Sequence, residues 1–174
     1  MPAVERNFFW GASHVTKSKV FLQKYSKESC LNITINAKGG RKFEDFDISI
    51  LPSPLPEVIV LAGEDNSIID GQISVSNYIK MVNEIIDKLS SMGIKVLLVA
   101  SLGRTHQPPK YGSLQKYKTI RRAIERKKNK FKVPRCRFSK QINNSMGHDG
   151  VHLTKYGYKE YSKNIVNFIN KIIN

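Results

Sequence analysis

The sequence predicts an α/β fold, a three-layer sandwich in which helices cover both faces of a central parallel sheet of about five strands. Short β-branched or aromatic runs alternate about five times with longer runs of helical period. The runs VIVLA (58–62) and VLLVA (96–100) are apolar throughout, as is typical of strands buried on both faces. The 174 residues, 40% of them hydrophobic, suit one domain with a sizeable core, so we expect residues 1–174 to form a single domain.

Three strands are predicted in the first part of the chain, because β-branched and aromatic residues favour extended backbone. The segments between these strands have apolar residues at helical spacing or contain paired glycines. The order is a strand at 4–10, a helix at 15–26, a strand at 30–36, a turn with a short helix at 39–46, and a strand at 57–62.

The clearest helix runs from Ser74 to Met92, where apolar side chains recur every three or four residues and Gly93 ends the run. The remaining elements follow from the same two periodicities. They are a buried strand at 94–101, a basic helix at 113–128, a weaker strand at 131–138, and a C-terminal helix marked by Tyr161, Ile165, Phe168, Ile169 and Ile172.

The charge is strongly positive and unevenly distributed. The formal net charge is +15, and the segment from Lys116 to Arg137 holds eleven basic residues against the single acid Glu125. Such a field favours an anionic partner, either nucleic acid or an anionic membrane surface, although a solvated helix face would have the same composition. The residues of this candidate basic surface are Arg121, Arg122, Lys127 and Lys128.

The N-terminal segment MPAVERNFFW lacks the apolar stretch of a secretory signal, and the apolar runs are shorter than the roughly 20 residues of a membrane span. Cys30 and Cys136 lie in strand-like contexts without partners at metal-binding spacing, which suits buried thiols. We therefore expect an intracellular, cytoplasmic protein.

Polar and glycine residues follow the predicted strands, where the ligand site of a parallel sheet lies. Ser13 in GASH follows the first strand, and Gly39 and Gly40 follow the second. GEDN (63–66) follows the third strand, and DGVH (149–152) precedes the last helix. These groups are expected to converge at one edge of the sheet.

Ser13, His152 and Asp149 would together supply the chemistry of nucleophilic acyl transfer. A serine needs an imidazole to accept its proton and a carboxylate to orient that imidazole. The spacing of three lets Asp149 reach Nδ1 of His152 while Nε2 stays free for Ser13. The backbone N–H groups of Ser13 and of Gly39 or Gly40 are candidate donors to an oxyanion. Each feature alone also fits an ordinary cap, turn or helix-dipole role, and it is their joint order that favours the catalytic interpretation.

Over nearly its whole length the chain resembles the SGNH (GDSL-like) hydrolase family. The segment DGVHLTKYGY (149–158) is very similar to the last block of that family, a D-x-x-H followed by a leucine and a glycine-aromatic pair. VIVLAGEDN (58–66) resembles the third block, FFWGASHV (8–15) the first and INAKGG (35–40) the second.

The resemblance implies a flavodoxin-like sandwich with specific roles for four residues. Ser13 would be the nucleophile, His152 the base, Asp149 the residue that orients the base, and Gly40 an oxyanion donor.

Two positions depart from the family pattern. Ala12 stands where the family has the aspartate of G-D-S, and Asp65 stands where it has an asparagine that donates to the oxyanion, with Asn66 next. An ionised Asp65 accepts hydrogen bonds but cannot donate them. Three alternatives stay open: the loop presents Asn66 to the site, Asp65 is held protonated, or catalysis is slow.

Four further residues are candidates to line the substrate: His14, Gly39, Gly63 and His106. His148 and His152 are four residues apart, as in some metal sites, but no further His or Cys lies at a matching spacing. The glycine-rich loops that bind phosphate are also missing, so we expect neither a metal nor a cofactor.

The sequence therefore predicts a serine esterase or acyl hydrolase of SGNH type that acts on a small, acetyl-like ester through an acyl-enzyme. The alternative is a protein of the same fold with weakened or lost catalysis that binds nucleic acid or anionic lipid through its basic surface.

Overall fold

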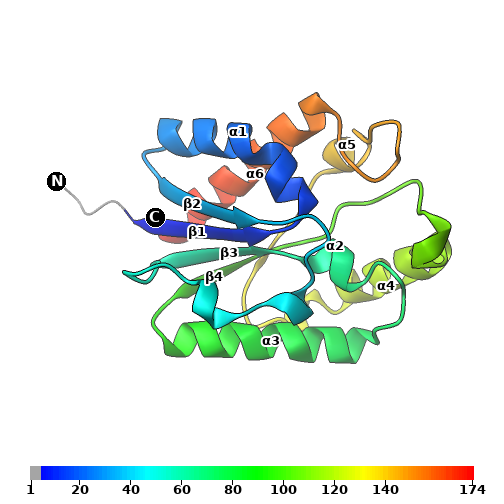
Figure 1. Ribbon diagram of the computed structural model, residues 1–174, viewed down its shortest axis with the longest axis horizontal. Coiled ribbons are helices and arrows are strands. Elements are labelled where there is room, and N and C mark those ends of the chain that lie inside the picture. Colours follow the sequence, from blue (N-terminus) through cyan, green and yellow to red (C-terminus); the bar gives the residue numbers. More distant parts are fainter. Residues whose placement is uncertain (1–4) are drawn as a thin grey trace.

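A computed structural model describes residues 5–174. Its five strands form one sheet in the order β2-β1-β3-β4-β5, and every neighbouring pair is parallel. Helices α1 and α6 lie over one face of the sheet and α3 lies over the other (Figure 1). The predicted three-layer sandwich with a parallel sheet of about five strands is confirmed.

The strands match the predicted positions closely, except at the weak fifth strand. That strand is only two residues long, because Pro134 directly before it has no N–H to donate to the ladder. The first predicted strand includes Val4, which lies outside the described residues. The bounds are β1 Arg6–Gly11, β2 Asn32–Ala37, β3 Val58–Ala62, β4 Lys95–Val99 and β5 Arg135–Cys136.

Three of the long helices begin at residues whose side chains cap the first turn, whereas α1 follows Ala12 and has no side-chain cap. The Ser74 hydroxyl caps α3, Ser113 caps α4 and Thr154 caps α6. Two single-turn helices, α2 and α5, are too short to give a periodic pattern and were not predicted. The bounds are α1 Ser13–Glu28, α2 Glu64–Ser67, α3 Val75–Ser91, α4 Leu114–Arg126, α5 Lys140–Asn143 and α6 Lys155–Ile173.

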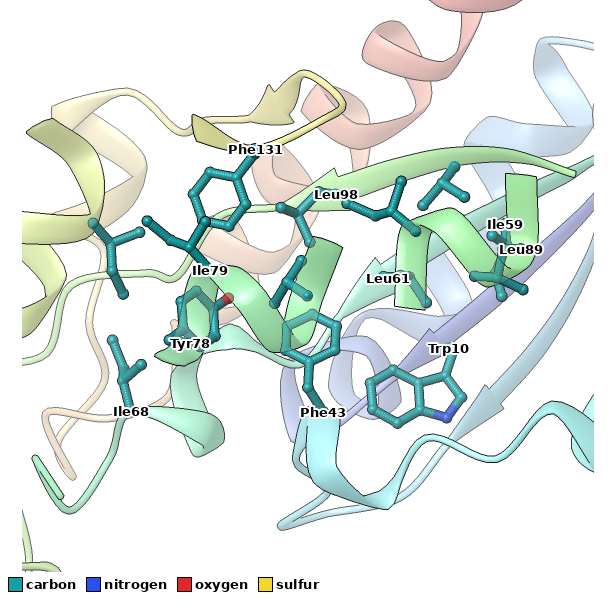
Figure 2. Packing of buried hydrophobic residues seen from close by; sticks show 14 of the residues in the cluster. Trp10, Phe43, Ile59, Leu61, Ile68, Tyr78, Ile79, Leu89, Leu98 and Phe131 are labelled. Carbon is teal, nitrogen blue, oxygen red and sulfur yellow. The ribbon is translucent and has the colours of Figure 1, made fainter. Parts of the chain in front are cut away.

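Alternate side chains of each central strand enter two separate hydrophobic clusters, as the period of two in a strand requires. Trp10 of β1 lies in the cluster under α3, where its ring stacks on Phe43 with centroids 5.6 Å apart (Figure 2). Phe9, the preceding residue, lies in the opposite cluster with α1 and α6. Cys136 is buried as expected, but Cys30 is exposed, because it lies in a turn with a φ of 56°.

Within residues 5–174, none of the helices is both long enough and apolar enough to cross a membrane.

The strand order sets the place of the site. The chain passes from β1 outward to β2 and then returns to β3 on the other side of β1. The carboxyl ends of β1 and β3 therefore flank the point where the strand order reverses, which is where open α/β sheets bind ligands. Ser13 comes two residues after the end of β1, and α2 follows β3 directly.

Candidate active site

Ser13 is held at the tight turn between β1 and α1. A Cβ on Gly11 would lie 2.3 Å from Cγ2 of Val15, so the close approach of strand and helix requires glycine there. Ala12 precedes the first turn of α1, and it is buried. As the first residue of the helix, Ser13 has a backbone N–H with no acceptor inside the helix. That N–H and the half-buried hydroxyl are both at the carboxyl edge of the sheet.

His152 and Asp149 lie in the loop between α5 and α6. An antiparallel bridge between Met146 and Leu153 closes this loop, and the N–H of Gly147 donates to the carbonyl of His152 at 2.7 Å. Asp149 Oδ1 accepts hydrogen bonds from the backbone N–H of His152 at 2.8 Å. The loop thus holds the acid and the imidazole in one hydrogen-bonded turn.

The three side chains converge across 139 residues of sequence. Nδ1 of His152 lies 2.6 Å from Oδ2 of Asp149, and Nε2 lies 3.3 Å from Oγ of Ser13. Burial raises the pKa of Asp149, but hydrogen bonds from the backbone and ring of His152 outweigh it and leave this pKa well below its usual value. Because the ionised carboxylate can only accept, Nδ1 carries the proton and Nε2 is free to accept from Ser13.

These side chains border a pocket of about 690 Å³. Nine of the ten candidate catalytic, oxyanion-binding and substrate-lining residues line it: Ser13, His14, Gly40, Gly63, Asp65, Asn66, His106, Asp149 and His152. Gly39, also expected near the substrate, is not among the described residues that line this pocket. Gly40, with a φ of +77°, occupies the third position of the turn at 38–41 and borders the pocket.

Asp65 accepts hydrogen bonds from three parts of the chain. The Tyr117 hydroxyl of α4 donates to Oδ1. The Leu102 N–H, after β4, donates to Oδ2 at 3.2 Å, and Nε2 of His14 lies 3.3 Å from the same oxygen. Nδ1 of His14 in turn lies 2.9 Å from the Tyr158 hydroxyl of α6. This network ties α1, which carries Ser13, to α2, α4, α6 and the loop after β4.

The surroundings of Asp65 favour its ionised form. Burial raises the pKa of the carboxyl, but the hydrogen bond and charge of His14, the charge of Arg104 and the Tyr117 hydroxyl together bring it below its usual value. These donors favour the ionised form of Asp65 over the protonated alternative. Asp65 acts here as an acceptor that organises its neighbours, and it cannot donate to an oxyanion.

Asn66 keeps a donor for the site. Its Nδ2 donates to the Arg41 carbonyl at 3.1 Å, which uses one of the two amide hydrogens. Since Asn66 lines the pocket, its second N–H can point to a ligand.

Sequence reasoning missed several polar residues of the site. Tyr117 and Tyr158 resemble ordinary apolar-face residues of their helices, and only the fold shows their hydroxyls beside Asp65 and His14. Glu64 is 2% exposed, and its carboxylate accepts from Nη2 of Arg135 at 2.6 Å. No local sequence signal marks these partners, because they lie far away in the chain.

The predicted basic surface is divided in the structure. Arg122, Lys127 and Lys128 are exposed on or just after α4, whereas Arg121 is half-buried and donates to the Ser101 carbonyl at 3.3 Å. A second pocket, of about 370 Å³, is lined by the five arginines Arg121, Arg122, Arg126, Arg135 and Arg137. Among residues 5–174 there is no cluster of three or more His, Cys, Asp or Glu side chains that could hold a metal ion.

The turn at Gly150 gives a first prediction. Gly150 has a φ of +64°, and a Cβ there would lie 2.7 Å from Cβ of His106 and 2.9 Å from its backbone nitrogen. Gly93 has a similar φ of +80° but open space around it. We expect Gly93→Ala to lower the free energy of unfolding by about 1 to 2 kcal/mol for the left-handed backbone alone. Gly150→Ala should cost about 1 to 3 kcal/mol more, because the loop must also move. Equal costs in urea unfolding would show that this contact is not tight.

The charge of Asp65 gives a second prediction. We expect Asp65→Asn to destabilise the protein by about 2 to 3 kcal/mol at pH 7, because charge-assisted hydrogen bonds are lost and an amide N–H faces other donors. Folding lowers this pKa below its usual 3.8, so the stabilisation is complete above that pH and is lost as the pH falls through the folded value.

The difference between wild type and Asp65→Asn should therefore be constant at neutral pH and shrink below about pH 4 in urea unfolding. Asp87→Asn is the matched control, since Asp87 forms an exposed pair with Lys132, and it should cost less than about 1 kcal/mol at pH 7. A difference for Asp65→Asn that grows on acidification would contradict the ionised state.

Comparison with the solved structures of other proteins supports the fold described above. No protein-family model matches the sequence, and no curated protein matches it significantly. Solved structures do match. A GDSL-like lipase from Bacteroides thetaiotaomicron superposes with a TM-score of 0.73 at 18% identity, covering 97% of this chain and 89% of the lipase. A lipase/acylhydrolase from Enterococcus faecalis has a TM-score of 0.68 at 14% identity, and the match covers 97% of this chain and 96% of the acylhydrolase.

An acetyl xylan esterase has a TM-score of 0.67 at 17% identity, covering 94% of this chain and 99% of the esterase. A protein from Slackia heliotrinireducens that is described as an SGNH hydrolase has a TM-score of 0.74 at 10% identity. The match covers 95% of this chain and 99% of that protein. The chain therefore has the α/β fold of the GDSL-like, or SGNH, hydrolases.

Proposed function

We propose that the chain is a serine ester hydrolase of SGNH type that acts on a small ester through an acyl-enzyme. The observation that carries this proposal is the unbroken contact from Asp149 through His152 to Ser13 at the wall of a pocket. A buried structural serine or a helix cap has no need of an imidazole so oriented.

The reaction begins with attack by Ser13 Oγ on the ester carbonyl carbon, while Nε2 of His152 accepts the hydroxyl proton. Asp149 stabilises the imidazolium through Nδ1–H. The tetrahedral intermediate then collapses, and the alcohol leaves with the proton from Nε2. In the second half a water molecule attacks the acyl-enzyme, with His152 again as base, and releases the acid and free Ser13.

The negative oxygen of the intermediate needs donors fixed in advance. The backbone N–H of Ser13, the N–H of Gly40 and the second amide hydrogen of Asn66 all border the pocket and supply them. The groups that contact the Asp65 carboxylate, on Leu102, Tyr117 and His14, offset its negative charge. The carboxylate therefore repels the oxyanion less than a carboxylate without these contacts would.

We propose a short acyl group such as acetyl. The similarity in fold to an acetyl xylan esterase supports this choice. The pocket volume of about 690 Å³ is large enough for a small ester together with part of its alcohol.

The test is hydrolysis of p-nitrophenyl acetate. Ser13→Ala should lower kcat on the order of 10⁴-fold, because the nucleophile is lost. Asn66→Ala should lower it about 10²- to 10³-fold, because one oxyanion donor is lost. Ser76→Ala, an exposed serine on α3, is the matched control and should leave the rate unchanged.

Absence of hydrolysis by folded wild-type protein, together with salt-sensitive RNA binding that Arg122→Gln, Lys127→Gln and Lys128→Gln abolish, would contradict the esterase proposal. That result would support the alternative, a protein of this fold that binds nucleic acid through its basic surface.

A further inference from the structure

The loop that follows β4 places a buried guanidinium group in the wall of the candidate active site. Arg104 is 6% exposed and lines the same pocket as Ser13 and His152. Its buried Nη1 has no hydrogen-bond partner among residues 5–174. Because an unpartnered buried charge is costly, this arrangement needs an explanation.

The immediate neighbours of Arg104 do not satisfy this nitrogen. The guanidinium lies 4.6 Å from the ring centroid of Tyr117, a cation–π contact that leaves the N–H groups free. Its charge helps to lower the pKa of Asp65. The hydrogen bonds to the Asp65 oxygens, however, come from His14, Tyr117 and Leu102.

The other carboxylates in the pocket wall are also engaged elsewhere. Glu64 pairs with Arg135, and Asp149 pairs with His152. Lys110 adds a second cation to the lining. The pocket therefore presents positive charge that the described protein groups do not hydrogen-bond.

A second group in the same loop is also unpartnered. Ser101 is 5% exposed, lines the pocket, and has a buried Oγ without a hydrogen-bond partner in the described part of the chain. The pocket lining thus includes a hydroxyl and a guanidinium that no described group hydrogen-bonds, and both types of group donate to anionic oxygen atoms.

We propose that Arg104 binds an anionic oxygen group, a carboxylate or a phosphate, that the ester substrate carries, so that the substrates are anionic esters. The inference rests on the proposed function, because Ser13 would act on the ligand that Arg104 holds. A guanidinium offers two parallel N–H groups to such an anion, and because Arg104 is buried this contact discriminates against neutral esters.

The competing explanation is that Arg104 only balances the charge of Asp65. In that case its removal would change the hydrolysis of all esters by the same factor. The two explanations therefore differ in a ratio of rates and not in the rate of one ester.

The first experiment compares three acetate esters: 4-acetoxybenzoate, 4-acetoxyphenyl phosphate and the neutral methyl 4-acetoxybenzoate. We expect wild type to prefer at least one anionic ester, and Arg104→Gln to lower the ratio of anionic to neutral kcat/KM by about 10- to 100-fold. The ester whose ratio falls identifies carboxylate or phosphate as the bound group. Arg104→Lys keeps the positive charge but loses the two parallel N–H groups of the guanidinium. It should therefore lower this ratio less than Arg104→Gln does.

Arg6→Gln is the matched control, because Arg6 is exposed at the opposite, amino-terminal end of β1 and its loss changes the net charge equally. It should leave the ratio unchanged. Equal losses on charged and neutral esters in Arg104→Gln, or no preference in wild type, would overturn the inference.

The second experiment needs no turnover. Calorimetry with Ser13→Ala should detect binding of 4-hydroxybenzoate or 4-hydroxyphenyl phosphate, and adding Arg104→Gln should weaken it at least about 10-fold. Binding that depends on Arg104 without any ester hydrolysis would overturn the esterase proposal alone. Hydrolysis without such binding would overturn the anion site alone.

Discussion

The parallel pairing of β1 with β3 is the constraint on which the candidate site depends. In this register Gly11 lies beside Ala62, so the segments that leave the two strands emerge side by side at one edge. An antiparallel pair would send them to opposite edges. Ser13 begins α1 at the end of β1, and the loop with His152 then needs only to cover the same edge. The remaining polar groups add to a geometry that the sheet has already set.

Asp65 shows how a change at one position can be absorbed by its surroundings. A carboxylate there cannot serve as a donor, yet it joins α1, α4 and the loop after β4 through His14, Tyr117 and Leu102. These contacts hold the pocket wall in place before a substrate arrives, which is what electrostatic stabilisation of a transition state requires. In the proposed mechanism, donation to the oxyanion falls to Asn66 and to backbone N–H groups. The same wall contains Arg104, so the group that we propose to select the substrate is a neighbour of the network that stabilises the wall.

Much of this arrangement was predictable, because it depends on short-range patterns. The apolar runs indicated β3 and β4, and the spacing of Asp149 and His152 indicated an acid that orients an imidazole. The contacts of Tyr117 with Asp65 and of Tyr158 with His14 join residues 52 and 144 positions apart. The periodicity of a single helix or strand cannot predict contacts over such distances in the sequence. Sequence alone also could not distinguish Gly39 from Gly40, because only the backbone shows which one takes the positive φ and borders the pocket.

Reaction with a fluorophosphonate probe, followed by mass spectrometry of the modified peptide, tests the central claim most directly, because the probe labels only a serine whose proton a base can accept. We expect one label on Ser13, with labelling strongly slowed in His152→Ala. A label on a different serine, the same labelling rate in His152→Ala, or no label on folded protein would contradict an activated serine at this edge of the sheet.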